Sequence, residues 1–471
     1  MIYGDMLASK EAGMLRERTL QPDYWDLILP EGVRRMSPEL EAVDALLDDD
    51  AFLAPFREVF TAKGGRPTIP METYLRLMYL KFRYQMGYEA LVAEVSNSIS
   101  WRLFSRVGLS GDVPDASTLS KLTKGKAKAA VATLNDALLT KLHEQGTIKG
   151  RRVRTDTTVL PATITYPTDI GLLADGLRVI GRNLAKLRSL GTVAGAAVEA
   201  VGQQMERTRA KVKEQLRGLS QRLKQKDRPA GVRQEATKAV LDVAEEAVEQ
   251  VTAALTEVRA PALGRTEQRL VQAIHDGLAV TRRLMEQTRQ VVGGNPHVKN
   301  RVVSIFDQEA RPIRKGKLKT PTEFGRTVRV DQSEEGYISG YAVHIGSPGD
   351  STQMVPAVEH HRAVFGQVPE QVTADRGMGC PSNDRTLAKL GVRDICLPQP
   401  GPLSEARKAL ESEPMFAELK KWRAGVEALI SLMKRAFGWD RCLFRDTPGA
   451  EAWMDWSVLA YNLRLYGRKA T

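Results

Sequence analysis

The sequence predicts an α/β fold in which one mixed sheet is flanked by helices, preceded by a helical domain and interrupted by a long helical block. Segments that alternate polar and β-branched residues begin only near Arg151. Residues 38–143 instead show the apolar spacing of short helices, and residues 170–292 are rich in Ala, Gln, Arg and Glu. We therefore expect three regions of different architecture.

Composition narrows the class of protein before any motif is considered. The 471 residues suffice for about two to four domains, and 69 basic against 57 acidic residues leave a net charge of +12, which suits a polyanion or simply solubility. Three cysteines without a C-x-x-C pair argue for a reducing compartment and against structural zinc, so any metal should have oxygen ligands. No signal-like segment and no run of 18 apolar residues occurs, so we expect a cytoplasmic protein without membrane contact.

The N-terminal region reads as short helices. Helices are expected over 70–85 and 88–95, meeting at Met86-Gly87, with 98–107 as a third. That turn has the length used in helix-turn-helix units, although a generic three-helix bundle fits equally well. We expect residues 1–148 to form a helical domain for DNA binding or dimerisation.

The helical block shows coiled-coil-like spacing. Apolar residues from Met205 to Leu223 step by 7, 4, 3 and 4, and breaks at 191–195, 229–231 and 261–264 predict antiparallel hairpins. Residues 206–238 hold eleven Lys or Arg against four Asp or Glu, whereas 239–257 hold five acids and no base. We expect the basic helix to be neutralised by the acidic one, with a dedicated DNA-binding face as the alternative.

Strand patterns surround this block. Without it, the order of expected elements is strand, strand, strand, helix, strand, helix, strand, helix, which is the ribonuclease H-like topology. The catalytic core would comprise 149–169 and 298–471, with 170–297 inserted between its first and second strands. The expected elements are strands at 151–160, 323–330, 337–345, 372–374 and 392–397, and helices at 350–365, 383–390, 415–435 and 450–466.

Three acids fall where this topology can hold metal ions. Asp156 lies on the first strand, Asp375 at the carboxyl end of the fourth, and Glu427 on the long helix 415–435. Carboxylates so placed can bind two Mg²⁺ ions, with Mn²⁺ as a substitute, and clamp both oxygens of an in-line phosphoryl displacement. Taken singly, Asp156 could be a hydrogen-bonded strand residue, Asp375 a turn residue and Glu427 half of a surface ion pair with Arg423.

A helical wheel adds two cations to the third acid. Arg423, Glu427 and Lys434 fall within about 40° of one another beside the apolar stripe of helix 415–435. A carboxylate flanked by two cations suits a metal ligand with neighbouring phosphate contacts.

Several stretches resemble the successive blocks of bacterial insertion-sequence DDE transposases, in the class whose last block is Y-x2-R-x3-E-x6-K. Arg423, Glu427 and Lys434 match its last three positions, whereas Lys420 stands at its Tyr position. Residues 64–109 are similar to the helical domain that precedes the core in these enzymes, and the resemblance spans about 60–465. The matching core blocks are VRTDTTVLPATITYPTDIGLLADGLRVI, RPIRKGKLKTPTEFGRTVRV, VTADRGMGCPSNDRTLAKLGV and WRAGVEALISLMKRAFGW.

The resemblance implies a metal-dependent enzyme that binds the terminal inverted repeats of its element, cleaves there and joins the ends to target DNA. It implies double-stranded DNA as partner, a homodimer or larger homo-oligomer on that DNA, and a bacterial cytoplasmic protein associated with the nucleoid when bound. A dense basic cluster before Pro321 favours contact with the DNA backbone. The expected DNA-binding residues are Arg311, Arg314, Lys315, Lys317, Lys319, Arg376, Arg423 and Lys434.

Other classes of function use part of the same pattern. A catalytically silent DNA-binding regulator derived from a transposase would keep the fold and the basic surface. A nuclease that cuts without joining would use the same acids. A structural coiled-coil adaptor would account only for residues 170–292.

Overall fold

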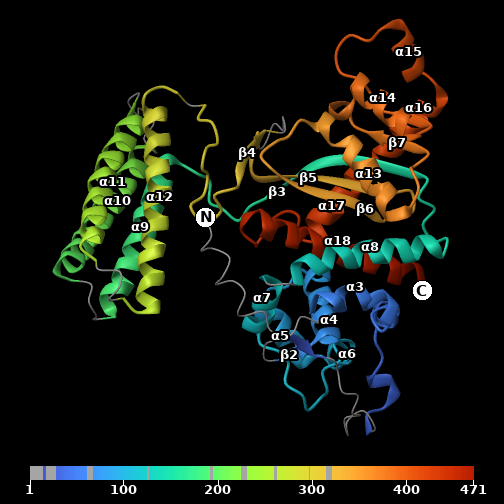
Figure 1. The fold of residues 1–471 in the computed structure, drawn as a ribbon, viewed down its shortest axis with the longest axis horizontal. Coiled ribbons are helices and arrows are strands. Elements are labelled where there is room, and N and C mark those ends of the chain that lie inside the picture. The colour runs from blue at the N-terminus through green and yellow to red at the C-terminus, as the bar shows by residue number, and fades with distance from the viewer. Residues whose placement is uncertain are drawn as a thin grey trace. The chain divides into compact units, whose positions relative to one another are not determined.

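A computed structural model describes residues 14–16, 28–60, 67–124, 127–190, 195–223, 231–258, 263–295, 297–314 and 321–470 (Figure 1). The chain divides into two compact units. The first contains residues 1–163 and 326–471, and the second contains residues 164–325. None of the described helices is both long and apolar enough to cross a membrane.

A mixed sheet of six strands organises the first unit. Its central strand β3 pairs in parallel with β7, and β7 pairs in parallel with β8. On the other side of β3 lies β5, which pairs antiparallel with β6. The strands of this unit thus lie in the order third, second, first, fourth, fifth, which agrees with the predicted ribonuclease H-like topology. Their bounds are β3 Arg152–Pro161, β5 Thr322–Ser333, β6 Ile338–Ile345, β7 Gln371–Ala374 and β8 Asp394–Cys396.

Helices cover the sheet because its strands alternate apolar side chains toward two cores. Val153 and Val372 pack with Met354 and Leu387 of the flanking helices. Val328 belongs to the larger core, together with apolar residues of α17 and α18. The helices of this part are α13 Met354–Phe365, α14 Pro381–Leu390, α15 Glu405–Glu411, α16 Pro414–Arg423, α17 Gly425–Ala436 and α18 Asp446–Ala470, with short 3₁₀ turns η4 Asp350–Thr352 and η5 Arg376–Met378.

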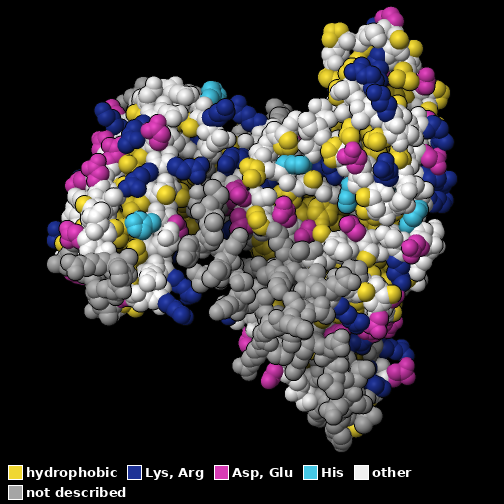
Figure 2. All heavy atoms as spheres, in the orientation of Figure 1, with side chains coloured by type: hydrophobic (Ala, Val, Ile, Leu, Met, Phe, Trp, Pro, Cys, Tyr) yellow, Lys and Arg dark blue, Asp and Glu magenta, His cyan; other side chains and the backbone are white. Residues whose placement is uncertain are grey.

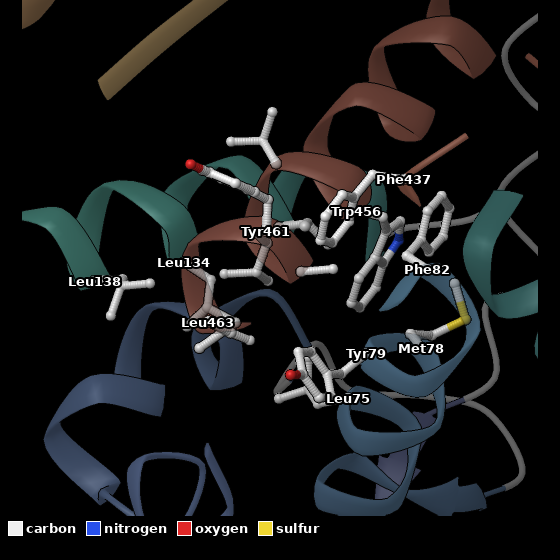
Figure 3. Packing of buried hydrophobic residues seen from close by; sticks show 14 of the residues in the cluster. Leu75, Met78, Tyr79, Phe82, Leu134, Leu138, Phe437, Trp456, Tyr461 and Leu463 are labelled. Carbon is white, nitrogen blue, oxygen red and sulfur yellow. The ribbon is translucent and has the colours of Figure 1, made fainter. Parts of the chain in front are cut away.

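The N-terminal helices share their core with the C-terminal helix α18. Figure 3 shows Phe82 of α4 beside Trp456 of α18, whose rings are stacked 6.3 Å apart. The N-terminal helices and the sheet therefore belong to one compact unit, and an independent domain over 1–148 stays a prediction. The helices are α2 Pro38–Leu46, α3 Asp50–Phe60, α4 Met71–Arg83, α5 Tyr88–Asn97, α6 Ile99–Phe104, α7 Ala116–Lys124 and α8 Ala127–Glu144; short strands β1 Met14–Arg16 and β2 Pro67–Pro70 pair in parallel.

The second unit consists mainly of four long helices that pack through aliphatic side chains. Its described core contains Leu, Ile, Val, Ala and Met but no aromatic ring. The segment is helical, as its apolar spacing predicts, while its role as an inserted domain stays a prediction; the predicted breaks fall largely outside the described residues. The elements are α9 Asp169–Ser189, α10 Gly195–Leu223, α11 Val232–Thr256, α12 Arg265–Val292 and the short strand β4 Arg311–Arg314, which pairs with Thr322–Gly325 of β5.

The expected neutralisation of α10 by α11 is wrong for the described residues. The two helices pack against each other, yet no ion pair among those residues joins them. Glu245 of α11 instead pairs with Arg289 of α12 at 2.7 Å, and Glu206 of α10 pairs with Arg188 of α9. The reason is geometric: the helices meet along their apolar stripes, so their charged faces point outward. Figure 2 shows basic and acidic side chains interspersed over the visible face of this bundle.

Candidate active site

The sheet places Asp156 and Asp375 side by side. Thr155 of β3 is in register with Ala374 of β7, so the next residue on each strand is one of these acids. Neighbouring strands lie about 4.8 Å apart, which brings the two aspartates within reach of shared ions. Each carboxylate accepts a local backbone N–H: Asp156 Oδ1 from Thr157 at 2.7 Å and Asp375 Oδ1 from Gly377 at 2.9 Å.

Arg423 connects Asp156 to Glu427. Its Nη1 lies 3.6 Å from Asp156 Oδ2, and its Nη2 donates to Glu427 Oε1 at 3.0 Å. Because one planar guanidinium spans both contacts, the two carboxylates are within about 9 Å of each other. The Asp156 side chain is 13% exposed and that of Glu427 is 64% exposed, so Glu427 forms the open side of the group.

The helix that carries Glu427 is broken, and the prediction of one continuous helix over 415–435 is wrong. Helix α16 ends at Arg423 and α17 begins at Gly425, which places Glu427 in the first turn of α17. Arg154 explains the break: its Nη1 donates to the carbonyl of Trp422 at 2.5 Å, an oxygen that a continuous helix would reserve for its own ladder. The cause therefore lies on β3.

Arg154 is held firmly at this break. Its guanidinium lies 4.9 Å from the centre of the Trp422 ring and donates twice to Gln332 Oε1. A Cβ on Gly425 would lie only 2.2 Å from Arg154 Nη1, so glycine is required for this approach. Since Arg154 and Asp156 are two residues apart on β3, they project from the same face. Arg154 thus fixes the start of α17 relative to the first acid.

A buried ion pair supports the strand beneath the acids. Arg329 Nε lies 3.1 Å from Asp331 Oδ2 on β5, and the two side chains are only 5% and 2% exposed. Asp331 Oδ1 also accepts the hydroxyl of Thr155, the neighbour of Asp156, at 2.9 Å. Sequence reasoning gave no role to this pair because both residues alternate with apolar ones on an ordinary strand.

A fourth acid near the site was missed from the sequence. Asp350, at the start of η4, accepts the Thr157 hydroxyl at 3.1 Å. A Cβ placed on Gly377 would lie 3.0 Å from Asp350 Oδ2 and 3.2 Å from Asp375 Oδ1, so these oxygens are within about 6 Å of each other. In the sequence Asp350 resembles a residue that begins a helix, and no local signal connects it with the other acids.

The acids are assembled but not arranged around one point. In the part of the chain that the structure describes, no group of three Asp, Glu, His or Cys side chains is set to ligate a single ion. Arg423 explains this, because its guanidinium lies between Asp156 and Glu427. The donors are nonetheless carboxylate oxygens, the ligands that Mg²⁺ prefers, and the positions of Asp156 and Asp375 fit a shared pair of ions.

The expected DNA-binding residues differ in how committed they are. Arg376 and Arg314 are exposed, whereas Arg311 donates to the carbonyls of Gln308 and Ala310. Lys434 is half-buried on α17. Lys315, Lys317 and Lys319 lie outside the described residues.

The expected reading helix near 98–107 is short and internally engaged. Helix α6 has six residues, and the guanidinium of Arg102 donates to the carbonyls of Ser96, Gly108 and Gly111. The ring of Trp101 lies against Tyr84 at 4.9 Å. The exposed positions nearby belong to α5 instead, among them Glu94 and Asn97.

Comparison with known families points in one direction. A family described as Transposase domain (DUF772) matches residues 30–125, and one described as Transposase DDE domain matches residues 330–463. No curated protein and no solved structure gives a significant match. The second match contains Asp375 and Glu427, and the first covers α2 to α7. Together with the sheet order, these matches show that the chain belongs to the insertion-sequence DDE transposases.

Proposed function

We propose that this protein binds the terminal inverted repeats of its own element, cleaves the DNA at those ends and joins them to target DNA. The observation that carries the proposal is the pairing of Asp156 and Asp375 on adjacent parallel strands, with Glu427 joined to Asp156 through Arg423. The family matches supply the DNA substrate.

The three acids would hold two Mg²⁺ ions, with Mn²⁺ as a substitute. Such ions lower the pKa of a bound water and stabilise both the attacking and the leaving oxygen of the phosphoryl transfer. Arg423 neutralises Asp156 and Glu427 and must release one of them before both could act as ligands. Arg154 holds the start of α17 so that Glu427 stays near β3.

The basic residues would bind the DNA backbone and the N-terminal helices would read sequence. Arg376, Arg423 and Lys434 lie on the elements that carry the acids, and Arg311 to Lys319 belong to the second unit. Phosphate contacts fix register without reading bases, so sequence reading needs another element, for which we propose the N-terminal helices, with α5 as the candidate. The enzyme would act as a homodimer or larger homo-oligomer.

The direct test uses a duplex that carries one element end and its flanking DNA. We expect the full chain with Mg²⁺ to cleave this duplex and to join it to a target plasmid. Asp375→Asn should abolish both reactions and leave duplex binding within about twofold. Asp440→Asn is the matched control, because Asp440 is an exposed residue outside the acid group. Cleavage by Asp375→Asn at the wild-type rate would overturn the proposal.

A further inference from the structure

We propose that Asp350 is a fourth carboxylate of the active site and contributes to binding the metal ions. This inference rests on the proposed function, because it assigns another residue to the same site. It concerns a residue outside the three acids of the DDE motif, and it is carried by the contacts of Asp350 with the strands that hold two of them.

Asp350 lies between the first and second acids. Its Oδ1 accepts the hydroxyl of Thr157, the residue that follows Asp156. Its Oδ2 faces Gly377 from one side while Asp375 Oδ1 faces the same glycine from the other, 3.0 and 3.2 Å from the position of a Cβ there. The carboxylate therefore lies near the carboxyl end of β7, where Asp156 and Asp375 already meet.

The position of Asp350 is fixed by the fold. The side-chain amide of Asn383, on α14, donates to the carbonyl of Ser351 at 2.7 Å and to that of Met378 at 2.8 Å. This residue therefore links η4, which carries Asp350, to η5, which follows Asp375. With Thr157 on one side and Asn383 behind it, Asp350 is held in place before any ion binds.

The ordinary explanation for an aspartate at this position does not apply. An Asp that begins a helix usually caps it, yet Gly349 and Gln353 are the capping residues of η4 and α13. The only described hydrogen bond to the Asp350 carboxylate comes from the neutral Thr157 hydroxyl. Asp375 likewise receives a described bond only from the backbone of Gly377. Two carboxylates this close, with neutral donors alone, favour the binding of a cation between them.

The test measures Mn²⁺ affinity by isothermal titration calorimetry on the full chain without DNA. We expect Asp350→Asn, which keeps the size of the side chain and its bond to Thr157, to weaken Mn²⁺ binding at least tenfold. Asp375→Asn should weaken it similarly, and Asp440→Asn should match the wild type. The melting temperature without metal should be unchanged or slightly raised in Asp350→Asn, because a like-charge contact is removed.

The outcomes separate this inference from the proposed function. Wild-type affinity in Asp350→Asn together with weak binding by Asp375→Asn would overturn the role of Asp350 alone. Absence of Mn²⁺ binding in the wild type would overturn both. If Asp350→Asn does not fold, Thr157→Val provides the test: it removes the hydroxyl that orients Asp350 and should weaken Mn²⁺ binding about threefold or more, and unchanged affinity would overturn the inference.

Discussion

The two units of the molecule treat charge in opposite ways. In the first unit charged side chains are buried: Arg76 is inaccessible and pairs with Asp44 at 2.7 Å, Arg329 pairs with Asp331, and Lys81 is enclosed by aromatic rings. In the second unit the core is aliphatic and the charges of α10 and α11 face outward. Burial in the first unit commits each charge to a partner, whereas charges of the second unit are available to another molecule.

This difference predicts where a charge substitution affects folding. Removing one member of a buried pair leaves the other without compensation, which costs far more than the pair contributes. Removing an exposed charge that has no partner changes little. Charge substitutions should therefore destabilise the first unit and leave the second nearly unchanged.

The largest effect is expected at the pair beneath the acids. Arg329→Met leaves Asp331 buried without its cation and should lower the free energy of unfolding by about 3–5 kcal/mol. Urea denaturation of the full chain measures this. Adding Asp331→Leu should restore part of the loss, because no buried charge remains. A double variant as unstable as the single one would show that the pair is not the cause.

A smaller effect with a pH signature is expected at Lys81. Burial lowers the pKa of Lys81 to about 8. Rings of Phe82, Tyr88 and Trp453 lie about 4.4 to 5.1 Å from its ammonium and offset part of that cost. Because the pKa in the folded state is below its usual value of 10.5, the wild type is least stable below pH 8 and gains stability as pH rises toward 10.5.

Lys81→Met should therefore raise the free energy of unfolding by about 1–2 kcal/mol at pH 7, and this advantage should shrink toward zero near pH 10. Lys389→Met, at an exposed position, is the control and should show no such pH dependence. Urea denaturation at both pH values decides the matter. A loss of stability in Lys81→Met at pH 7 would show that the rings outweigh the cost of burial.

The helix break provides a prediction about geometry at the site. Gly425→Ala adds a Cβ that would clash with Arg154, so we expect a loss of about 1 kcal/mol in stability and a 10- to 100-fold slower cleavage as Glu427 shifts. DNA affinity should hardly change. In an Arg154→Met background the alanine should have much less effect on stability. Additive effects of the two substitutions would contradict the proposed contact.

The sequence predicted those parts of the site that depend on local pattern. Asp156 lies on a strand with clear alternation, and Asp375 follows the short buried run Val372–Ala374. The break before Glu427 could not be predicted, because it is caused by Arg154, 268 residues away from Trp422 in the chain. Asp350 was missed for the same reason: its contact with Thr157 spans 193 residues.

Net charge misled the interpretation of the helical block. The opposite charges of 206–238 and 239–257 suggested that the two helices pair, but a count of charges does not say which way side chains point. Val212 and Val248 belong to the aliphatic core through which the bundle packs, and this stripe determines the orientation of both helices. The charges then occupy whatever faces remain.

The smallest effect on stability is expected on α10. Six bases between Arg207 and Arg222 have no described ion-pair partner, and five of them are exposed. Replacing four exposed ones, Arg207, Lys211, Arg217 and Arg222, by Gln should change the free energy of unfolding by less than about 0.5 kcal/mol, since no partner is lost and Gln suits a helix. We expect the same variant to bind duplex DNA less tightly, with the salt dependence reduced by about 0.9 for each phosphate contact removed. Exposed acids of α11 replaced by Gln, such as Glu246 and Glu249, are the matched control and should not weaken DNA binding. A loss of more than about 1 kcal/mol in the α10 variant would mean that its cations are paired in solution, and the contrast between the two units would fail.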